Sequence, residues 1–432
     1  MESLPNDIEP TTLLAGSGAR SRFGGLWRHH DFMRLWAGQT ISQFGSTVTR
    51  EALPYTAILV LGASPLQMGL LGAAGAAPLL LLGLFAGVWV DRVRRRPLMI
   101  AADMGRALLL LSVPIAYLLG WMRIEQLYLV AALTGVLTVF FNVAYQSILP
   151  SLVRREHVLE GNSKLSLSES VAEIGGPPLG GVLVQLISGP ITLLLDALSF
   201  VFSAFMLRRI QAEEPPPAPV AQHEHVWRDL ATGLRAIWGD PLLRAMAGTS
   251  AIQSFFGWFF GAIYGLYAIR VVGMNTAMLG FTVAFGGIGA LFGALLVRPA
   301  TRRFGPGPTI VAGLLISSGM SLLTWLAGGL PALAVPLMMA SQLIGDGAST
   351  VAQIDETSLR QTITPDNMLG RVNASMSVLG EGIGTLGLLV GGLLGELIGL
   401  RSTVAVAALG GLLGCVWILW SPLPRLHALP VE

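Results

Sequence analysis

Long apolar runs follow one another along most of this 432-residue chain. Each run can cross the hydrocarbon core of a bilayer as an α-helix, which takes about 20 residues. Open sheets cannot lie in lipid with unpaired backbone groups, and the runs are too long and uniform for barrel strands, so we expect helices. Twelve runs are found, near residues 35–61, 66–90, 97–120, 127–149, 164–188, 190–207, 242–270, 276–297, 308–328, 331–353, 372–398 and 402–420. The sequence therefore predicts an all-α membrane protein with twelve transmembrane helices.

The composition excludes several classes of protein. Only 12% of the residues are charged and 53% are hydrophobic, whereas soluble domains carry about 25% charged residues. The only lysine, Lys164, lies in Gly-Asn-Ser-Lys-Leu, which is not a P-loop, so this chain alone cannot drive transport with ATP. Cys415 is the only cysteine, and the linker pair His223 and His225 has no further ligands beside it. We predict no enzymatic activity, no cofactor, no metal site and no nucleic-acid partner.

Basic residues indicate the orientation in the membrane, because Arg and Lys are retained on the cytoplasmic side. Of the 27 basic residues, 22 fall in the two tails, the central linker and alternate loops, and only Arg123, Arg270 and Arg401 fall in the opposite loops. The first 30 residues contain no apolar signal-peptide core, so we expect insertion to begin with the first span. The count predicts that both termini are cytoplasmic in a bacterial plasma or inner membrane.

The polar segment after the sixth span divides the chain. It opens with Glu213-Glu214-Pro215 and ends in apolar residues at helical spacing, including Trp227 and Trp238, which predicts an amphipathic helix along the inner membrane surface. The expected organisation is a cytoplasmic tail, a six-helix half, a linker with this helix, a second six-helix half and a second tail, over residues 1–34, 35–208, 209–241, 242–420 and 421–432.

The two halves repeat each other in sequence. An offset of 210 residues aligns Arg34 with Arg244, Gln43 with Gln253 and, in the loops, Arg92 with Arg302. The register is nearly free of gaps over about 150 residues, which indicates duplication and parallel repeats about an axis along the membrane normal. Such repeats place a substrate site near the midplane between them, so we expect a small-molecule substrate.

The loop after the second span carries a recognisable motif. Gly83-x3-Gly87-Val-Trp-Val-Asp91-Arg92-Val-Arg94-Arg95-Arg96 resembles motif A of the major facilitator superfamily, with Arg94 where most members have glycine. We expect the glycines to allow close helix approach and the charges to form a gating network at the cytoplasmic mouth. The predicted gating residues are Gly83, Gly87, Asp91, Arg92, Arg95, Asp103 and Arg106, with Asp103 and Arg106 paired to each other and to the motif.

Other segments narrow the resemblance. Trp36-Ala-Gly-Gln-Thr-Ile-Ser-Gln-Phe-Gly-Ser and Ala102-Asp103-x2-Arg106 look like the drug-efflux branch that contains macrolide-efflux and enterobactin-exporter relatives. Gly176-Pro177-Pro178-Leu179-Gly180-Gly181 resembles motif C, which the superfamily associates with exporting antiporters. Its prolines bend the helix, and its glycines let the helix press against the opposite half along a line of close packing, which we call the seam. Gly387, Gly391 and Gly395 of the eleventh span are expected to continue this seam. Tight packing without a functional direction is the alternative.

Ionisable residues inside the spans are candidates for coupling transport to protons, because a carboxyl group in a low dielectric takes up a proton readily. We rank Glu51 first, with Asp346 and Glu173 next and Arg50 beside them; each can instead bind a cationic substrate or rest in a satisfied network. The fourth span has no arginine of the motif B kind, so Arg50 or Arg106 would have to replace it. Asp355 and Glu356 are expected to face water. Further intramembrane candidates are Glu169, Asp196, Glu381 and Glu396.

Spans 1, 4, 7 and 10 are expected to line the central cavity. Their aromatic, methionine and amide side chains suit a bulky amphipathic compound better than a sugar. The candidate cavity residues are Gln39, Gln43, Asn142, Tyr145, Gln253, Phe256, Trp258, Tyr264 and Gln342, followed by Phe140, Phe141, Phe259, Met338 and Met339.

These features predict a monomeric exporter of amphipathic organic compounds that works by alternating access in exchange for protons. Two alternatives stay open. One is a dedicated exporter of a single endogenous product, such as a siderophore or an antibiotic. The other is a lipid flippase, whose activity would depend on lipid.

Overall fold

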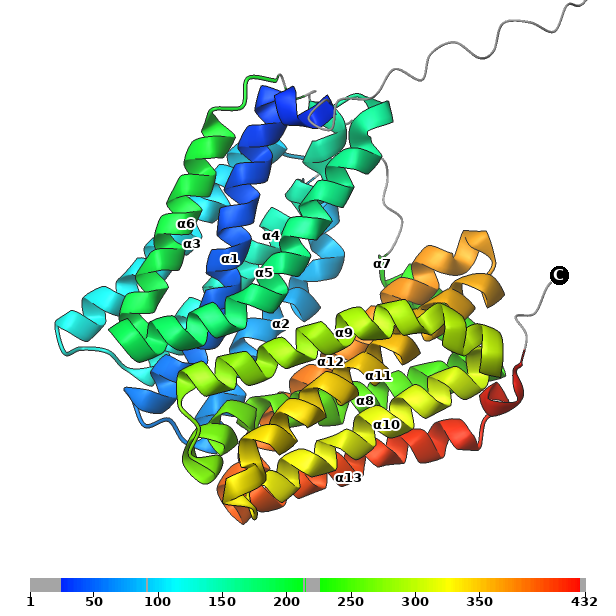
Figure 1. Ribbon diagram of the computed structural model, residues 1–432. Helices are drawn as coiled ribbons and strands as arrows, with labels where there is room; N and C mark the ends of the chain where they lie inside the picture. Colours follow the sequence, from blue (N-terminus) through cyan, green and yellow to red (C-terminus); the bar gives the residue numbers. More distant parts are fainter. Residues whose placement is uncertain (1–24, 91, 213, 215–225, 428–432) are drawn as a thin grey trace, which may run out of the picture.

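The computed structural model describes residues 25–90, 92–212, 214 and 226–427, with the side chains of residues 84, 88 and 226 excepted. This part of the chain forms thirteen α-helices and short 3-10 or π turns, without a strand (Figure 1). The first half contains α1 (His30–Leu59), α2 (Pro65–Val90), α3 (Arg95–Leu118), α4 (Ile124–Leu152), α5 (Val158–Ile187) and α6 (Gly189–Arg208). The second half contains α8 (Pro241–Tyr267), α9 (Thr276–Phe304), α10 (Pro306–Ala327), α11 (Ala334–Ile363), α12 (Asp366–Ile398) and α13 (Leu400–Leu419).

The predicted helical class is therefore confirmed, and each of the twelve apolar runs forms one helix. Ten of the described helices are long and apolar enough to cross a membrane. Of the twelve helices that the apolar runs form, α1 and α11 are not apolar enough by composition. They carry Arg50, Glu51 and Asp346 within their length. Several helices are longer than the runs; α11, for example, continues to Ile363 although its apolar run ends near 353. The length of an apolar run therefore predicts a membrane-crossing helix, but it does not predict the polar turns by which that helix continues beyond the run.

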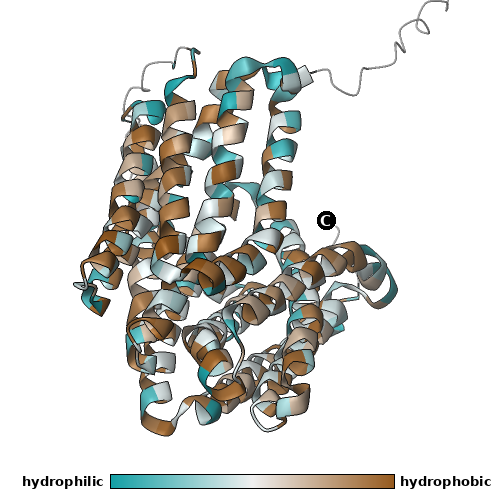
Figure 2. Ribbon diagram, turned by 60° about the vertical axis from the view of Figure 1, so that its left-hand side comes forward, coloured by the Kyte–Doolittle hydropathy of each residue, from teal (hydrophilic) through white to brown (hydrophobic). Residues whose placement is uncertain are grey.

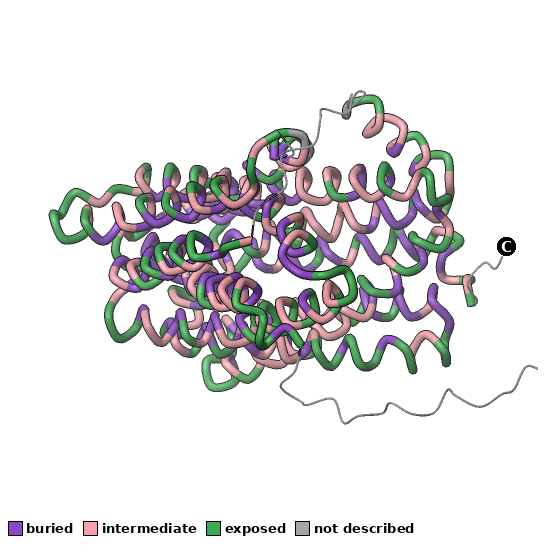
Figure 3. The backbone as a smooth tube through the Cα atoms, turned by 90° about the horizontal axis from the view of Figure 1, so that it is seen from above, coloured by how far each residue is buried: buried purple, intermediate pink, exposed green. Residues whose placement is uncertain are grey.

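The outer faces of the helices are apolar. Leu81, Leu108, Leu118 and Leu295 each expose more than 60% of their surface, and Figure 2 shows hydrophobic residues along the helices with hydrophilic ones gathered towards their ends. Figure 3 shows buried segments on the inner sides of the helices and exposed ones on the outside. Large exposed leucines over whole helices are unfavourable in water and are expected of a surface that faces lipid.

The helix that follows the linker, α7 (Val226–Gly239), packs on α12 and α8. Arg371 Nε of α12 lies 2.7 Å from Asp229 Oδ1, and the Ser375 hydroxyl donates to the carbonyl oxygen of Leu230. Trp227 and Trp238 are exposed on its surface. The amphipathic helix is thus present and fastened to the second half, while its position along the membrane surface stays a prediction.

The helices alternate in direction, so their ends form two faces. We call the face at which α1 begins, α6 ends and α7 lies the linker face, and the other the closed end. The halves meet through α2 with α12 and through α5 with α9. The contacts concentrate towards the closed end, where Arg270 donates to the carbonyl oxygen of Ala63 and Thr276 to that of Gly181. Towards the linker face the two halves diverge (Figure 1).

Candidate functional site

The described residues enclose several cavities inside and between the halves, of which three concern the site. The first-half cavity, of about 750 Å³, is bounded mainly by α1, α2, α4, α5 and α6 and reaches α8 and α12. The second-half cavity, of about 580 Å³, is bounded by α8, α10, α11 and α13. The interface cavity, of about 470 Å³, lies between α1 and α5 of one half and α9 and α11 of the other. The predicted lining by spans 1, 4, 7 and 10, which are α1, α4, α8 and α11, therefore holds in part, because α5, α6 and α9 also contribute.

The predicted cavity residues separate into two groups. Gln39, Gln43, Asn142 and Tyr145, with Phe141, line the first-half cavity. Gln253, Phe256, Trp258 and Gln342 line the second-half cavity. Tyr264 is packed against the core, and its buried hydroxyl makes no hydrogen bond to the described residues. Three further candidates lie away from these cavities: Phe140 contacts Trp89, and Phe259 and Met338 are buried in the core. The structure thus brings the amide side chains to the cavities and buries several of the apolar ones.

The interface cavity gathers the residues ranked highest for proton coupling. Arg50, Glu51 and Glu173 of the first half share it with Asp346 of the second half. Arg50 pairs with Glu173 through two hydrogen bonds, of 3.0 and 2.7 Å, and Glu51 accepts a 2.7 Å hydrogen bond from Tyr55. Asp346 lies against Gly286, where any Cβ would overlap its carboxylate. Charged groups from both halves therefore face one space, although no contact joins Glu51 to Asp346 directly.

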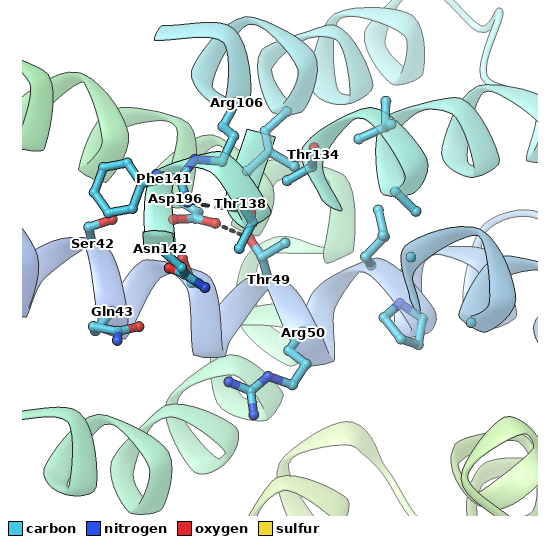
Figure 4. A pocket seen from close by; sticks show the side chains of 18 of the residues that line it. Ser42, Gln43, Thr49, Arg50, Arg106, Thr134, Thr138, Phe141, Asn142 and Asp196 are labelled. Atoms are coloured by element: carbon cyan, nitrogen blue, oxygen red, sulfur yellow. Dashed lines mark hydrogen bonds between the residues drawn. The ribbon is translucent and has the colours of Figure 1, made fainter. Parts of the chain in front are cut away.

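A second charged group is buried within the first half. Arg106 Nη2 of α3 lies 2.5 Å from Asp103 Oδ1, and its guanidinium stacks between the rings of Phe141 and Phe200. Asp196 of α6 accepts a 2.6 Å hydrogen bond from the hydroxyl of Thr49. Figure 4 shows Thr49 pointing towards Asp196 and Arg106, while Arg50 points away from them on the other side of α1.

The local pairing of Asp103 with Arg106 is confirmed, but the predicted pairing with motif A is not found among the described residues. Arg106 instead contacts α4 and α6, which hold it towards the middle of the first half. Asp196 was expected only as one of several further intramembrane candidates. The signal was present, because Asp196 is the only charged residue of the 190–207 run.

Motif A is described except for Asp91, which lies outside the described residues together with His223 and His225 of the linker. Arg95 donates to the carbonyl oxygen of Ser147, and its backbone amide donates to Glu214 at 2.5 Å. The close helix approach expected at Gly83 and Gly87 is wrong for this structure: a Cβ at Gly87 would meet nothing within 4 Å and one at Gly83 only a leucine of the preceding turn. No described residue of the second half lies within 4 Å of a Cβ at either glycine, and Arg92 is exposed.

Motif C forms the seam that its glycines predicted. A Cβ at Gly176 would overlap Thr47 of α1, and one at Gly181 would overlap the carbonyl oxygen of Thr276 in the opposite half. A Cβ at Gly180 would lie 3.3 Å from Val48 and Glu51, and the carbonyl oxygen of Pro177 fills the place of a side chain at Gly280. The expected continuation in α12 needs correction: Gly387 and Gly391 pack on α8 of their own half, because the turns that face α2 carry Gly392 and Gly395.

Two carboxylates at the linker-face end of α11 were expected to face water, and for Asp355 this is wrong. Asp355 does not face water: it is buried and accepts from the Thr301 hydroxyl of α9, with distances of 2.7 and 2.9 Å. Glu356 lines the second-half cavity beside Arg360. In the internal repeat, Thr301 aligns with Asp91, and Asp355 aligns with Tyr145. The first half therefore has its carboxylate after the second span, whereas the second half has it in the helix that corresponds to the fourth span.

Two six-helix repeats that enclose cavities between and within them are the architecture of a secondary transporter. The sequence matches the family described as Major Facilitator Superfamily over residues 35–384. The chain belongs to the major facilitator superfamily. It is accordingly a multi-pass membrane protein that transports a small molecule.

Individual relatives agree with this assignment. The multidrug efflux pump Tap of Mycolicibacterium fortuitum is 28% identical over 397 residues, which cover 89% of this chain and 93% of that protein. The enterobactin exporter EntS of Shigella dysenteriae is 25% identical over 391 residues, 89% of each chain. Among solved structures, a bacterial homologue of the iron transporter ferroportin, in its inward-facing state, has a TM-score of 0.74 at 19% identity and covers 92% of this chain and 99% of that one. The two sequence relatives confirm the resemblance to the drug-efflux branch. The similarity to the ferroportin homologue shows only that the fold is shared.

Proposed function

We propose that this protein is a secondary active exporter of amphipathic organic compounds, which works by alternating access and exchanges its substrate for protons. The observation that carries the proposal is the interface cavity, in which Arg50, Glu51 and Glu173 of one half face Asp346 of the other. A movement of the halves changes the surroundings of all four groups at once, so protonation and substrate binding can depend on the same motion. Export from the cell is supported by the similarity to efflux proteins and by the seam at motif C.

The linker face is cytoplasmic in this proposal. The basic residues that the structure describes in the linker and the alternate loops lie at this face, which is the distribution of the positive-inside rule. The halves diverge here and pack together at the closed end, so the structure corresponds to a state that takes up its substrate from the cytoplasm.

The position of the carboxylates supports proton exchange. A carboxylate in a cavity that is open to one side equilibrates with protons on that side, and the opposite state exposes it to the other. Glu51 remains the first candidate, because it lies in the interface cavity on α1, beside the Arg50–Glu173 pair that joins α1 to α5. Asp346 supplies the second-half group and Glu173 the third candidate.

The lining favours an amphipathic substrate. The first-half cavity combines the amides of Gln39, Gln43 and Asn142 with apolar walls, and aromatic side chains line the second-half cavity. The similarity to an enterobactin exporter favours a second candidate, a dedicated exporter of one endogenous product. A panel of substrates separates the two, because a dedicated exporter moves one compound of the panel or none.

The variant Glu51→Gln tests the coupling role. It removes the titratable group and keeps the size of the side chain, so we expect proton-driven export to fall at least about tenfold while substrate binding stays within about threefold of the wild type. Glu125→Gln is the matched control, since Glu125 is an exposed carboxylate at the closed end. Full proton-driven export by the Glu51→Gln protein, at equal amounts in the membrane, would remove Glu51 from the mechanism.

A further inference from the structure

The buried charges of the first half do not balance. Asp103, Arg106 and Asp196 expose 0%, 3% and 1% of their surface, so none is solvated as it would be in water. Two carboxylates face one guanidinium, which leaves one excess negative charge when all three are ionised. An uncompensated buried charge is costly, and a carboxylate in such a place is neutralised by a proton or a bound cation.

The geometry assigns the excess to Asp196. Arg106 pairs with Asp103, its neighbour one turn away on α3. The hydrogen-bond partners of the Asp196 carboxylate are hydroxyl groups, those of Thr49 on α1 at 2.6 Å and Ser199 on α6 at 2.8 Å. In the described part of the chain, no cation pairs with Asp196. It is therefore the carboxylate that a proton neutralises with the least disturbance of its neighbours.

The hydroxyl of Ser199 indicates the same protonation state. Ser199 Oγ lies 2.8 Å from the backbone carbonyl oxygen of Asp196 and also 2.8 Å from its Oδ1. A serine hydroxyl has one hydrogen, so it makes a full hydrogen bond to only one of these acceptors or a weaker, shared one to both. When Asp196 Oδ1 carries a proton, it donates to Ser199 Oγ, while Ser199 donates to the carbonyl oxygen. Both short contacts are then hydrogen bonds, and Oδ2 still accepts from Thr49.

We propose that Asp196 is a proton-binding site of the first half, which is protonated in this structure and separate from the carboxylates of the interface cavity. Asp103 and Arg106 form the charged pair beside it. The proton binds as the carboxylate becomes a carboxylic acid, and it is returned as the free ion. No other reactant takes part.

The site is placed to exchange its proton during the transport cycle. Asp196 and Arg106 line the first-half cavity, whose other charged groups are Arg50, Glu169 and Glu173. Thr49 precedes Arg50 and Glu51, so the α1 segment that holds the proton site also carries two groups of the interface cavity. A displacement of α1 that withdraws Thr49 changes the binding of the proton. This role in transport rests on the proposed function, whereas the proton site itself does not.

Infrared spectroscopy of the purified protein in nanodiscs tests the site without any substrate. Titration to alkaline pH should remove a protonated-carboxyl C=O band from the wild-type spectrum, and the band should shift in D₂O. We expect Asp196→Asn to lack this component, and Asp196→Glu, Glu51→Gln and the exposed control Glu125→Gln to retain it. An Asp196→Asn spectrum identical to that of the wild type would overturn the proposal.

Thr49→Val gives a second test that does not require loss of the carboxylate. In the proposed geometry, the C=O oxygen of protonated Asp196 accepts from Thr49, and loss of a hydrogen bond raises a C=O stretching frequency. The band should therefore remain in Thr49→Val and move to a higher frequency, while Thr49→Ser restores it. An unmoved band in Thr49→Val contradicts the assignment even if Asp196→Asn fails to fold.

Substrate-induced proton release in weakly buffered solution then separates the two proposals. The compound is the one that the transport panel identifies, and we expect release in the wild type to fall at least about tenfold in Asp196→Asn with compound binding retained. The infrared band with no release from the wild type would contradict proton antiport and leave the proton site standing. Undiminished release from Asp196→Asn would overturn the role of Asp196 in transport.

Discussion

The guanidinium of Arg50 in α1 forms a bidentate ion pair with the carboxylate of Glu173 in α5, with N–O distances of 2.7 and 3.0 Å. The pair lies beside the seam at which motif C packs α5 against α1 and α9. Both side chains border the space between the halves, and they expose 60% and 47% of their surface. The pair therefore joins two charged side chains of the cavity, and it links α1 to the helix α5 that packs against α9 of the other half.

Its exposure predicts that the pair matters more for transport than for stability. Exposed ion pairs contribute between zero and about 1 kcal/mol, so Glu173→Gln should leave the melting temperature nearly unchanged. We expect its proton-driven export to fall at least about tenfold, because Arg50 loses its partner in the cavity. The control is Glu156→Gln, whose exposed carboxylate lies 3.7 Å from Arg154 at the linker face. Equal transport by the two variants would contradict the prediction.

The closed end depends on a glycine of α9. A Cβ at Gly280 would overlap the carbonyl oxygen of Pro177, and backbone cannot turn aside as a side chain can. Gly280→Ala should separate the halves at this end, whereas Gly319→Ala, where a Cβ meets nothing within 4 Å, should not.

Spin labels can measure this separation. Cysteines replace the exposed residues Glu125 and Arg401, one in each half at the closed end, and Cys415→Ala removes the only native thiol. We expect the distance distribution to shift to longer values in Gly280→Ala and to stay unchanged in Gly319→Ala. Identical distributions would show that the seam tolerates a methyl group at Gly280.

Phe200 holds the buried arginine of the first half. The guanidinium carbon of Arg106 lies 4.1 Å from the centre of its ring and 4.3 Å from that of Phe141. Phe200→Leu removes a cation–π contact worth about 0.5–2 kcal/mol and leaves part of the volume empty. We expect a clear loss of thermal stability in a purified-protein melt, against little change for Phe281→Leu on the exposed surface. Equal melting temperatures for the two variants would contradict this role.

Thr301 is predicted to stabilise the second half at the linker face. Its hydroxyl donates to the buried Asp355, and Thr301→Val would leave that carboxylate without this donor. The expected cost is about 1–3 kcal/mol, the penalty for a buried polar group that loses its partner. Thr301→Ser keeps the hydroxyl and should melt close to the wild type. A Thr301→Val protein as stable as Thr301→Ser would show that water or another group replaces the donor.

The sequence predicts the helices well, because a crossing segment needs about 20 apolar residues and little else can satisfy its backbone. It also predicts that the glycines of motif C, Gly181 among them, press against the opposite half, since small residues allow backbones to touch. The facing glycine of α9, Gly280, was found only from the structure. Ranking the charged residues by motif did not find the partners of Asp196 and Asp355. Those partners, Thr49 and Thr301, lie about 150 and 50 residues away in sequence, and hydroxyl groups carry no pattern along a helix.

The close approach expected at Gly83 and Gly87 was wrong for a different reason. A glycine marks where two helices can approach, but the contact exists only in the state in which the halves close at that face. The sequence encodes every state of a transporter together, and the structure shows one. Asp103 and Arg106 illustrate the same limit, because their spacing predicts the pair but not the aromatic rings that hold it within the first half.

The most direct test of the central claim uses everted membrane vesicles, in which the cytoplasmic face is outside and the interior is acidified. Dyes, macrolides, siderophores and lysolipids are added in turn, and the interior pH is followed with and without the protein. The account predicts that at least one amphipathic compound raises the interior pH in a protein-dependent manner, because its entry is exchanged for protons. A compound that the protein accumulates inside without any change in interior pH would contradict proton-coupled export.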